Sequence, residues 1–151
     1  MRKEFIIRWA NKKDIPAINS LTKEMHKLLG KLVGLRFSDK DLREEEVKIS
    51  ELKGIIVAEH KDDGVVGYIS FDPKPSSDEW YGKHIYLNEI AVKKGFRGKG
   101  IGKELMNRFI SICRRKKFNI KVDTLIKNKK TIEFYEKIGF KPLIINFILK
   151  K

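Results

Sequence analysis

The first third of the chain changes from a strand pattern to helical spacing. Phe5 to Trp9 is a mostly apolar run that contains a single arginine, which predicts a strand. Asp14 and Pro16 then have the residue types that favour the cap and the first turn of a helix. The apolar residues of this helix recur at helical spacing, at Ile18, Leu21, Met25, Leu28 and Leu29. We predict a second helix from about Asp39 to Leu52.

Two apolar stretches in the middle of the chain are joined by a tight turn. Ile55 to Ala58 and Val65 to Phe71 flank the turn Lys61-Asp62-Asp63-Gly64, a pattern that predicts a hairpin. Asp72 to Lys83 contains two prolines, two serines and a glycine, so we expect a loop there. His84 to Val92 is the next predicted strand.

The C-terminal part alternates between helices and strands. After the glycines of Gly95 to Gly102, an apolar stripe predicts a helix that ends near Lys117 and buries Ile101, Leu105, Phe109 and Ile112. The remaining predicted elements are a strand at Ile120 to Ile126, a helix at Lys129 to Ile138 stopped by Gly139, and a closing strand at Leu143 to Leu149. This order predicts a single α/β domain over residues 1–151, with a mixed central sheet flanked by helices.

The composition fits one globular domain in the cytoplasm. A chain of 151 residues with 41% hydrophobic and 36% charged residues can bury a core without disulfides. Cys113 is the only cysteine and lies in a helical pattern, so we expect it to pack rather than to act as a nucleophile. The N-terminal residues lack the features of a signal peptide, and no apolar run reaches the roughly 20 residues of a membrane-spanning helix. We therefore expect a cytoplasmic protein without a membrane partner.

The net charge of +14 is confined to one part of the chain. Residues 1–90 contain 16 basic and 16 acidic residues, whereas residues 91–151 contain 18 basic and 4 acidic residues. Ser38 to Glu51 is locally acidic, with six acids against three bases. This asymmetry indicates that the two ends of the fold face partners of opposite charge.

A glycine-rich turn stands at the start of the basic part. Arg97-Gly98-Lys99-Gly100-Ile101-Gly102-Lys103 lies between a predicted strand and a predicted amphipathic helix, where backbone N–H groups bind anions. Glycines allow phosphate oxygens to approach such a turn closely. A Walker A loop is excluded because Ile101, not lysine, follows Gly100. The glycine spacing also fails the G-x-G-x-x-G dinucleotide pattern.

The turn and its flanks resemble a known acyltransferase family. Ile85 to Val92, with Phe96 and the Arg97 to Gly102 run, resembles motif A of the GNAT (Gcn5-related N-acetyltransferase) superfamily, whose pattern is Arg/Gln-x-x-Gly-x-Gly/Ala. Asn128 to Phe140, which contains Phe134-Tyr135-Glu136 and Gly139-Phe140, resembles its motif B. The resemblance implies an N-acetyltransferase that transfers the acetyl group of acetyl-CoA to an amine acceptor in a ternary complex.

The same resemblance implies where the cosubstrate binds. The strands at 84–92 and 120–126 are expected to splay apart and to hold the pantetheine arm, while the glycine turn holds the diphosphate. The implied contact residues are Ile90, Ala91, Val92, Arg97, Gly98, Lys99, Gly100, Ile101, Gly102, Lys103, Asn128, Lys130 and Tyr135. Because CoA is strongly anionic, a cofactor site in the basic part would account for the charge asymmetry.

The transfer needs an acid for the departing thiolate and a base for the amine. In the family, a tyrosine at the position of Tyr135 often protonates the CoA sulfur, so Tyr135 is our candidate acid. Glu89 is our first candidate base, since a half-buried carboxylate on the cleft strand can acquire a pKa suited to that role. Asp123 on the neighbouring strand and a chain of water molecules are the alternatives. Strand alternation does not decide which side chains face the cleft, because this strand usually carries a bulge in the family.

The acceptor and the oligomeric state stay open. Ile85-Tyr86-Leu87 and the glycine turn also resemble the diamine and polyamine acetyltransferases, but Asn88 stands where that branch has an acid. The acids of Ser38 to Glu51 and of the loop at 72–83 favour a cationic amine acceptor. A non-catalytic CoA-binding domain and a basic nucleic-acid-binding domain are the rival readings, and a homodimer is an open alternative. His26, His60 and His84 show no partner pattern, and we expect no metal.

Overall fold

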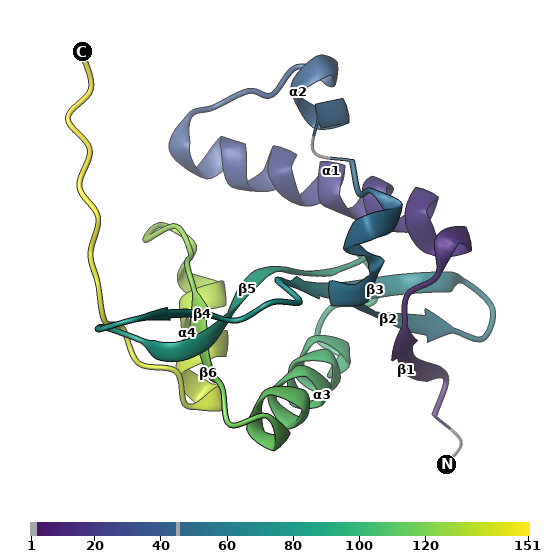
Figure 1. The fold of residues 1–151 in the computed structure, drawn as a ribbon. Helices are drawn as coiled ribbons and strands as arrows, with labels where there is room; N and C mark the ends of the chain where they lie inside the picture. The colour runs from purple at the N-terminus through teal and green to yellow at the C-terminus, as the bar shows by residue number, and fades with distance from the viewer. Residues whose placement is uncertain (1–2, 45) are drawn as a thin grey trace.

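The computed structural model describes residues 3–44 and 46–151, which form a sheet between helices (Figure 1). The strands are β1 (Phe5–Trp9), β2 (Ile55–His60), β3 (Gly64–Phe71), β4 (Ser76–Asp78), β5 (Gly82–Val92) and β6 (Asn119–Val122). The α-helices are α1 (Ile15–Val33), α2 (Asp39–Glu44), α3 (Ile101–Arg115) and α4 (Lys129–Ile138). Short 3-10 helices, η1 (Lys12–Asp14) and η2 (Ile49–Gly54), precede α1 and β2.

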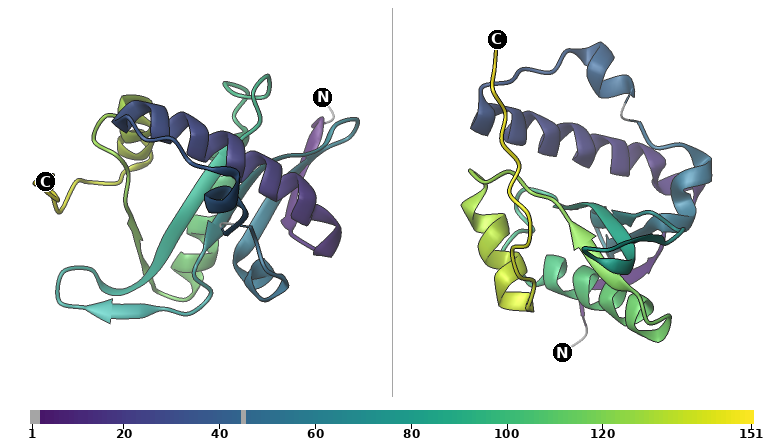
Figure 2. Two further views of the ribbon diagram at one scale, coloured as in Figure 1. Left: turned by 90° about the horizontal axis from the view of Figure 1, so that it is seen from above. Right: turned by 60° about the vertical axis from the view of Figure 1, so that its left-hand side comes forward.

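The sheet is mixed, as the sequence predicts. Its main path runs in the order β1, β2, β3, β5, β4 with antiparallel neighbours, and β6 pairs with β5 in parallel. Helix α1 lies over one face of the sheet, whereas α3 and α4 lie on the opposite side (Figures 1 and 2). The result is a layered α/β domain with a separate core on each face of the sheet.

The two cores confirm most of the predicted apolar stripes, although Leu28 is 43% exposed and Ile112 is only partly buried. Ile18 and Leu21 of α1 pack with the buried residues Ile55, Val57 and Tyr68 on one face. On the other face, α3 contributes Ile101, Leu105, Met106, Phe109 and Cys113. Cys113 is 2% exposed, and burial raises the pKa of its thiol to about 11, so it packs as predicted.

Strands β5 and β6 pair only over their first part. Their register runs from His84 opposite Asn119 to Leu87 opposite Val122. Beyond Leu87, β5 continues along β3 to Val92, whereas β6 ends at Val122, so the predicted extension of this strand to Ile126 is wrong. Within residues 3–44 and 46–151, no strand therefore pairs with the β6-facing edge of β5 from residue 88 to residue 92. This separation is the splay that the family resemblance implies.

A bulge in β5 lies where the two strands separate. Ser70 of β3 is opposite Glu89 and Phe71 is opposite Leu87, so Asn88 is an additional residue in β5. An additional residue reverses the alternation of side chains beyond it. The bulge that we expected in this strand is thus present.

The side chains of β5 show the effect of the bulge. Before it, Ile85 and Leu87 belong to the core on the α3 face. After it, Ile90 and Val92 pack against the same core, although their positions have the opposite parity. Ala91 packs on the α1 face, and Glu89 bonds residues of that face.

The predicted second helix is divided into two short elements. α2 ends at Glu44, before Glu46 in the acidic run, and η2 begins only at Ile49. Carboxylates at a helix C-terminus are unfavourable because they face the negative end of the helix dipole. The backbone then turns towards α1, where the Val47 N–H donates to the side-chain oxygen of Asn19 at 2.9 Å. Glu45 lies outside the described residues.

The predicted loop at 72–83 contains a short strand, so that prediction is partly wrong. β4 pairs with the start of β5, from Ser76 opposite His84 to Asp78 opposite Gly82. Asp78 accepts the backbone N–H groups of Trp80 and Tyr81 at 2.9 and 2.8 Å and thereby closes the turn. The hairpin was not predicted because the prolines and serines of this segment are typical of a loop.

The predicted closing strand at Leu143 to Leu149 is absent. This part of the chain is not assigned to a strand and extends away from the rest of the molecule (Figures 1 and 2). By contrast, the preceding helix α4 has the predicted bounds and ends at Gly139, which has a φ of +118°. Strand propensity alone does not form a strand: an apolar, β-branched sequence must also pair with a sheet edge, and this segment pairs with none among the described residues.

Asp14 lies directly before α1, as predicted, but its carboxylate bonds neighbouring groups. The Arg8 guanidinium donates to both carboxylate oxygens, at 2.8 and 2.9 Å, and the Asn11 N–H donates at 2.8 Å. Asp14 is buried, and these bonds, first that from Arg8, hold the pKa of the carboxyl below its ordinary value. The pair fixes the connection between β1 and α1.

Candidate functional site

The glycine turn presents unsatisfied backbone donors. Among the described residues, the N–H groups from Arg97 to Lys103 have no hydrogen-bond acceptor, and regular bonding resumes with the Glu104 N–H on the Gly100 carbonyl at 3.0 Å. Gly98 and Gly100 have φ values of +77° and +83°, which favour glycine. Such a run of free donors at a helix N-terminus matches an anionic ligand.

The charged side chains of the turn differ in what they contact. The Arg97 Nε donates to the Val92 carbonyl at 2.8 Å, and its NH2 group lies 3.4 Å from Glu24 of α1. The Arg97 side chain therefore fixes the turn to the end of β5. The Lys99 Nζ lies 5.3 Å from the ring centre of Phe96. Lys99 and Lys103 are exposed, so their charges are available at the turn.

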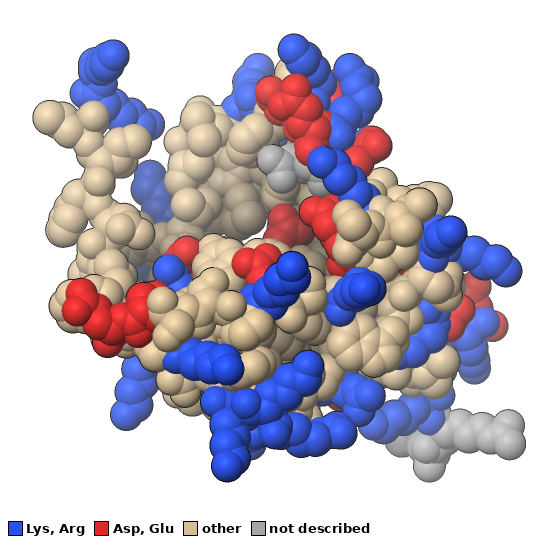
Figure 3. All heavy atoms as spheres, viewed as in Figure 1, with Lys and Arg blue, Asp and Glu red and all other residues tan. Residues whose placement is uncertain are grey.

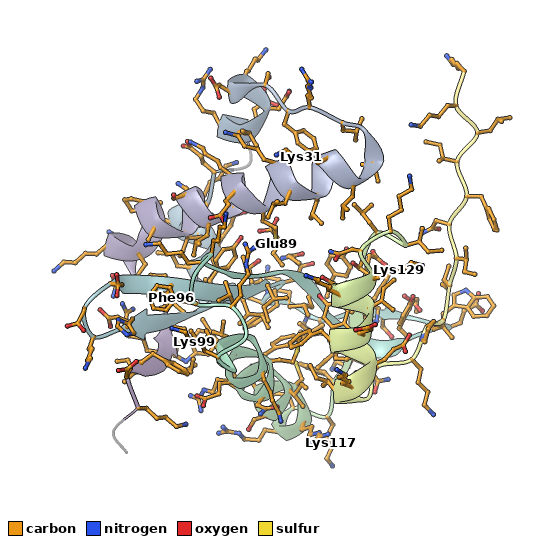
Figure 4. All side chains as sticks on the ribbon, turned by 180° about the vertical axis from the view of Figure 1, so that it is seen from behind. Lys31, Glu89, Phe96, Lys99, Lys117 and Lys129 are labelled. Atoms are coloured by element: carbon orange, nitrogen blue, oxygen red, sulfur yellow. The ribbon has the colours of Figure 1, made fainter. Side chains whose placement is uncertain are left out.

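Helix α4 begins with a second set of unpaired groups. Asn128 is half-buried, and its side chain has no hydrogen-bond partner among the described residues. The backbone N–H of Lys130 likewise has no described acceptor. Figure 4 shows Lys99 next to the start of α3 and Lys129 at the start of α4, so both helix starts are visible from one side of the molecule. The open edge of β5 belongs to the same region, because Val92 leads into the glycine turn.

Tyr135 lies in the core on the α3 face. It is 8% exposed, and its ring centre lies 5.7 Å from that of Phe134 and 5.4 Å from that of Phe140. Its hydroxyl has no described hydrogen-bond partner. Among the described residues, every fully buried polar side-chain atom has a hydrogen-bond partner. The Tyr135 hydroxyl is therefore not fully buried and reaches the surface. Burial raises its pKa to about 12, so the hydroxyl keeps its proton at neutral pH.

Glu89 lies on the other face of the sheet and accepts two hydrogen bonds. The Tyr68 hydroxyl donates to Oε2 at 2.5 Å, and Nε2 of His26 lies 2.8 Å from Oε1. Burial, the Glu89 charge and this bond raise the pKa of Tyr68, so its hydroxyl stays a donor. Thr22 of α1 extends the network, with Oγ1 at 2.7 Å from the Tyr68 hydroxyl. The Glu89 side chain is 24% exposed and remains accessible.

The sequence did not indicate the partners of Glu89. His26 shows no partner pattern in the sequence, yet it contacts Glu89 in the structure, and Tyr68 and Thr22 were not candidates. These residues come from α1 and β3, and the three-dimensional fold alone brings them to β5. His60 and His84 also have neighbours, since His60 lies 3.0 Å from Asp63 and His84 bonds the Gly82 carbonyl at 2.8 Å.

Asp123, the second candidate base, lies immediately after β6. It accepts a hydrogen bond from the Tyr86 hydroxyl at 2.8 Å. Burial, followed by the bond and charge of Asp123 and then the charge of Asp72, raises the pKa of Tyr86 to about 12. Tyr86 and Asp123 are therefore neighbours where β5 and β6 separate. Neither Asp123 nor Tyr135 belongs to the hydrogen-bond network of Glu89.

An open groove lies between α1 and the segment that carries α2. It has a volume of about 430 Å³ and apolar walls formed by Leu29, Val33, Leu35, Phe37, Leu42 and Leu125. Asp41 and Glu44 provide its carboxylates. His26, the partner of Glu89, also lines the groove, so the groove leads to the Glu89 network.

The surface charge differs between the two sides of the sheet. Figure 3 shows Lys and Arg side chains gathered over the α3 side, whereas acidic and basic side chains occur together around α2 and further acidic side chains lie along the sheet below α1. Residues 3–44 and 46–151 contain no group of three or more His, Cys, Asp or Glu side chains that could hold a metal ion. In the same part of the chain, no helix has the length and apolar character needed to span a bilayer.

Comparison with known proteins gives local sequence similarity to named acetyltransferases. A thialysine N-epsilon-acetyltransferase of Sus scrofa is 32% identical over 65 residues, which are 42% of this chain and 38% of the relative. An uncharacterized N-acetyltransferase of Methanocaldococcus jannaschii is 33% identical over 76 residues, which are 50% of this chain and 34% of the relative. The matched region thus spans well under half the length of these relatives.

Solved structures share the whole fold. The BH1408 protein from Bacillus halodurans has a TM-score of 0.78 at 21% identity, covering 97% of this chain and 99% of that one. The AAC(6′)-Iy structure, in complex with a bisubstrate analog, has a TM-score of 0.72 at 17% identity and covers 99% of both chains. A model of the Acetyltransferase (GNAT) family matches residues 6–140. With the splayed strands and the glycine turn described above, this match means that the chain belongs to the Acetyltransferase (GNAT) family.

Proposed function

We propose that this protein transfers the acetyl group of acetyl-CoA to a primary amine of a cationic acceptor, by direct transfer in a ternary complex. The proposal is carried by the free N–H groups from Arg97 to Lys103 next to the open edge of β5. Together they offer donors for a diphosphate and a strand edge for an extended amide-containing chain, which is the chemistry of CoA. The match to the GNAT family supports the same cosubstrate.

Each part of the proposed cosubstrate site has a distinct role. The N–H groups of Gly98 to Lys103 bind the diphosphate, while Lys99 and Lys103 add positive charge. Ile90, Ala91 and Val92 provide the open strand edge for the pantetheine amides. Asn128 and the Lys130 N–H bind the arm from the start of α4. Arg97 contributes its backbone N–H, because its side chain holds the Val92 carbonyl.

The proposed acid and base approach the transfer from opposite faces of the sheet. Tyr135 belongs to the α3 face, and the Glu89 network belongs to the α1 face. Because β5 and β6 pair only as far as Leu87 and Val122, strand pairing does not separate the two faces beyond this level. The acceptor can therefore enter from the α1 side while the cosubstrate occupies the side of α3 and α4.

The proposed chemistry balances without a covalent enzyme intermediate. Bound acetyl-CoA supplies a thioester carbonyl carbon, to which the neutral amine nitrogen forms a bond as the C–S bond breaks. Glu89 accepts the amine proton, directly or through water, and Tyr135 supplies a proton to the sulfur. Cys113 supports direct transfer, since its buried thiol, with a pKa of about 11, is unsuited to accept the acetyl group.

The groove supports a cationic acceptor with an apolar part. Asp41 and Glu44 provide negative charge among apolar walls, and His26 connects the groove to Glu89. This extends the sequence-based expectation that the acids of Ser38 to Glu51 face the acceptor. The names of two similar proteins, a thialysine N-epsilon-acetyltransferase and an aminoglycoside N-acetyltransferase, denote amine acceptors.

The decisive experiment measures release of free CoA thiol from acetyl-CoA across a panel of amines. The panel contains polyamines, aminoglycosides and peptides with free N-termini, and mass spectrometry identifies the acetylated product. We expect amine-dependent thiol release that is greatest for a cationic acceptor. Binding of acetyl-CoA without turnover of any amine would instead favour the non-catalytic CoA-binding alternative. Failure to bind acetyl-CoA would reject the cosubstrate site itself.

A further inference from the structure

Helix α3 and the residues that end it carry positive charge that the protein itself does not neutralise. Residues 101–117 contain six basic residues and one acidic residue. The basic residues are all exposed and are Lys103, Arg108, Arg114, Arg115, Lys116 and Lys117. The acid, Glu104, is paired with Lys3 at 3.0 Å, and within residues 3–44 and 46–151 none of the six basic side chains forms an ion pair. Such a cluster of unpaired like charges favours a partner of opposite charge.

The proposed cosubstrate site does not account for most of this charge. Arg114 lies in the last turn of α3, which at about 1.5 Å per residue is about 20 Å along the helix from the glycine turn. Figure 4 shows Lys99 beside the start of α3 and Lys117 beyond its end. Exposed charges are screened over about 8 Å at physiological ionic strength, so the far end of α3 hardly acts on a diphosphate at the turn. Only Lys103 belongs to the turn, and the other five residues form what we call the α3 basic face: Arg108, Arg114, Arg115, Lys116 and Lys117.

An open groove lies in the α3 basic face, beside the end of α4. It has a volume of about 390 Å³ and is lined by Asn107, Ile110, Ser111, Arg114, Arg115 and Ile138. None of these lining residues is acidic, and their polar side chains have no hydrogen-bond partner among the described residues. Amide, hydroxyl and guanidinium groups are the side-chain groups that contact phosphate oxygens in nucleic-acid complexes. A guanidinium can also donate two hydrogen bonds to one phosphate, so the groove fits a phosphate group.

Lys117 has a backbone conformation that favours glycine. Its φ is +58°, and among the described residues it is the only non-glycine residue with a positive φ. The N–H groups of Lys117 and Phe118 donate to carbonyls of the last turn at 3.1 and 2.9 Å and thereby end α3. Glycine is the usual residue at such a position because it has no Cβ to oppose a positive φ. Strain of this kind collects at functional sites, which favours a role for the Lys117 charge.

The composition of α3 favours a double-helical nucleic acid over a membrane or a single strand. Helices that bind membranes insert apolar side chains, yet every residue of α3 is described and none of its large apolar side chains is exposed. Proteins that bind single strands stack the bases on accessible aromatic rings. Phe109, the aromatic residue of α3, is 0% exposed, and Phe118 packs against the core. Contacts with the closely spaced phosphates of a duplex remain.

We propose that the α3 basic face binds a double-helical nucleic acid, DNA or RNA, through its phosphodiester backbone. Arg114 and Arg115 bind a phosphate in the groove, and Arg108, Lys116 and Lys117 contact neighbouring phosphates. The face has no side chain positioned to read bases by stacking, so the binding is independent of base sequence. This inference is also independent of the proposed acetyl transfer, because the two sites lie at opposite ends of α3.

The first test measures binding of the full chain to labelled DNA and RNA duplexes of about 20 base pairs by fluorescence anisotropy, over a series of salt concentrations. We expect a micromolar dissociation constant at low salt that rises steeply with salt. Arg114→Gln/Arg115→Gln should weaken binding about 10-fold or more and reduce the slope of log affinity against log salt by about 1 to 2. Lys12→Gln/Lys13→Gln is the matched control, because it removes the same charge from exposed residues of η1 and should leave binding nearly unchanged.

The second test separates the charge of Lys117 from its effect on folding. Lys117→Gly removes the charge and relieves the backbone strain, so the variant should melt at the same or a higher temperature yet bind the duplex more weakly. Binding to either duplex supports the proposal, and the comparison of DNA with RNA identifies the preferred one. Four results would overturn it: no binding of either duplex at low salt, equal losses in the two double variants, release of the duplex by excess CoA, or tighter binding to a single strand or to phosphatidylserine vesicles.

Discussion

His26 of α1 contacts Glu89 of β5, with Nε2 of His26 2.8 Å from Oε1 of Glu89. The two residues are 63 positions apart in the sequence. Tyr68 bonds the other carboxylate oxygen at 2.5 Å. Both carboxylate oxygens are thus oriented by neighbours, and the group is held at the end of the groove that we assign to the acceptor. A positioned and accessible carboxylate fits a general base better than an unrestrained one.

Replacing Glu89 with glutamine should remove the base while preserving the side-chain size. We expect the turnover number to fall on the order of 10²- to 10⁴-fold, with little change in the Michaelis constant for acetyl-CoA. Asp123→Asn is the matched variant, because it neutralises the alternative carboxylate in the same way. Steady-state kinetics of both variants decide which carboxylate is the base. A larger loss of turnover for Asp123→Asn than for Glu89→Gln would assign that role to Asp123.

Tyr135→Phe should lower turnover by about 10²-fold with little effect on binding of acetyl-CoA. The phenyl ring keeps the contacts with Phe134 and Phe140, whereas the proton donor is lost. Tyr81→Phe is a suitable control, since the Tyr81 hydroxyl also lacks a described hydrogen-bond partner but Tyr81 belongs to the β4–β5 turn. Full turnover in Tyr135→Phe would reduce Tyr135 to a packing residue.

Acetyl-CoA should raise the melting temperature, and Gly100→Ala should abolish this increase. A ligand that binds only the folded state at 100 times its dissociation constant stabilises by about 2.7 kcal/mol, or several degrees for a chain of this size. Gly100 and Gly64 have φ values of +83° and +70°, with open space at both positions for an added Cβ. Gly64→Ala at the first residue of β3 is therefore a control for backbone strain. Thermal scans should show similar losses of stability in both variants, but a lost response to acetyl-CoA only in Gly100→Ala.

Glu44→Lys should reduce the catalytic efficiency for a cationic amine more than Asp39→Lys does. Both substitutions reverse one charge on α2, but only Glu44 lines the groove. Because exposed charges are screened over about 8 Å at physiological ionic strength, the difference should be largest at low salt. Kinetics with one cationic acceptor at several salt concentrations test this. Equal losses in the two variants, or a best acceptor that is anionic, would contradict the role of the groove.

Asp14→Asn should destabilise the fold at neutral pH by on the order of 2 kcal/mol, since it breaks a largely buried ion pair with Arg8. The Asp14 pKa lies below its ordinary value of 3.8 in the folded state, chiefly because of the Arg8 hydrogen bonds. The stabilisation is therefore fully present above about pH 4 and is lost as the pH falls through the folded-state pKa. Urea unfolding at pH 7 and pH 2.5 should show a large difference between Asp14→Asn and the unchanged chain only at pH 7. A difference that is independent of pH would contradict the electrostatic explanation.

Local signals in the sequence predicted the elements that depend on neighbouring residues. Pro16 and Gly139 mark the start of α1 and the end of α4, and the turn before Gly64 joins β2 and β3. The glycine turn was identified because positive φ angles and a following amphipathic helix leave a clear residue pattern. These features require no knowledge of distant contacts.

Features that depend on distant contacts could not be predicted in the same way. The Glu89 network joins α1, β3 and β5, so no spacing along the chain reveals it. The strand predicted at Leu143 to Leu149 is absent, because a strand needs a paired edge as well as a favourable composition, and the composition does not show whether the segment reaches one. The end of β6 at Val122 likewise follows from its divergence from β5, not from a change in composition.

Asn88 sets the shape of β5 rather than the faces of its side chains. Deletion of this additional residue would restore regular alternation, because Leu87 already pairs with Phe71 and Glu89 with Ser70. Glu89 would still point towards His26 and Tyr68, and Ile90 towards the core beside α3. The deletion would instead remove the local bend and the extra twist that a bulge gives to a strand, at the level where β5 and β6 separate. A related protein with an alignment gap at this position should therefore keep the carboxylate on the same face but have a straighter strand that separates less from its neighbour.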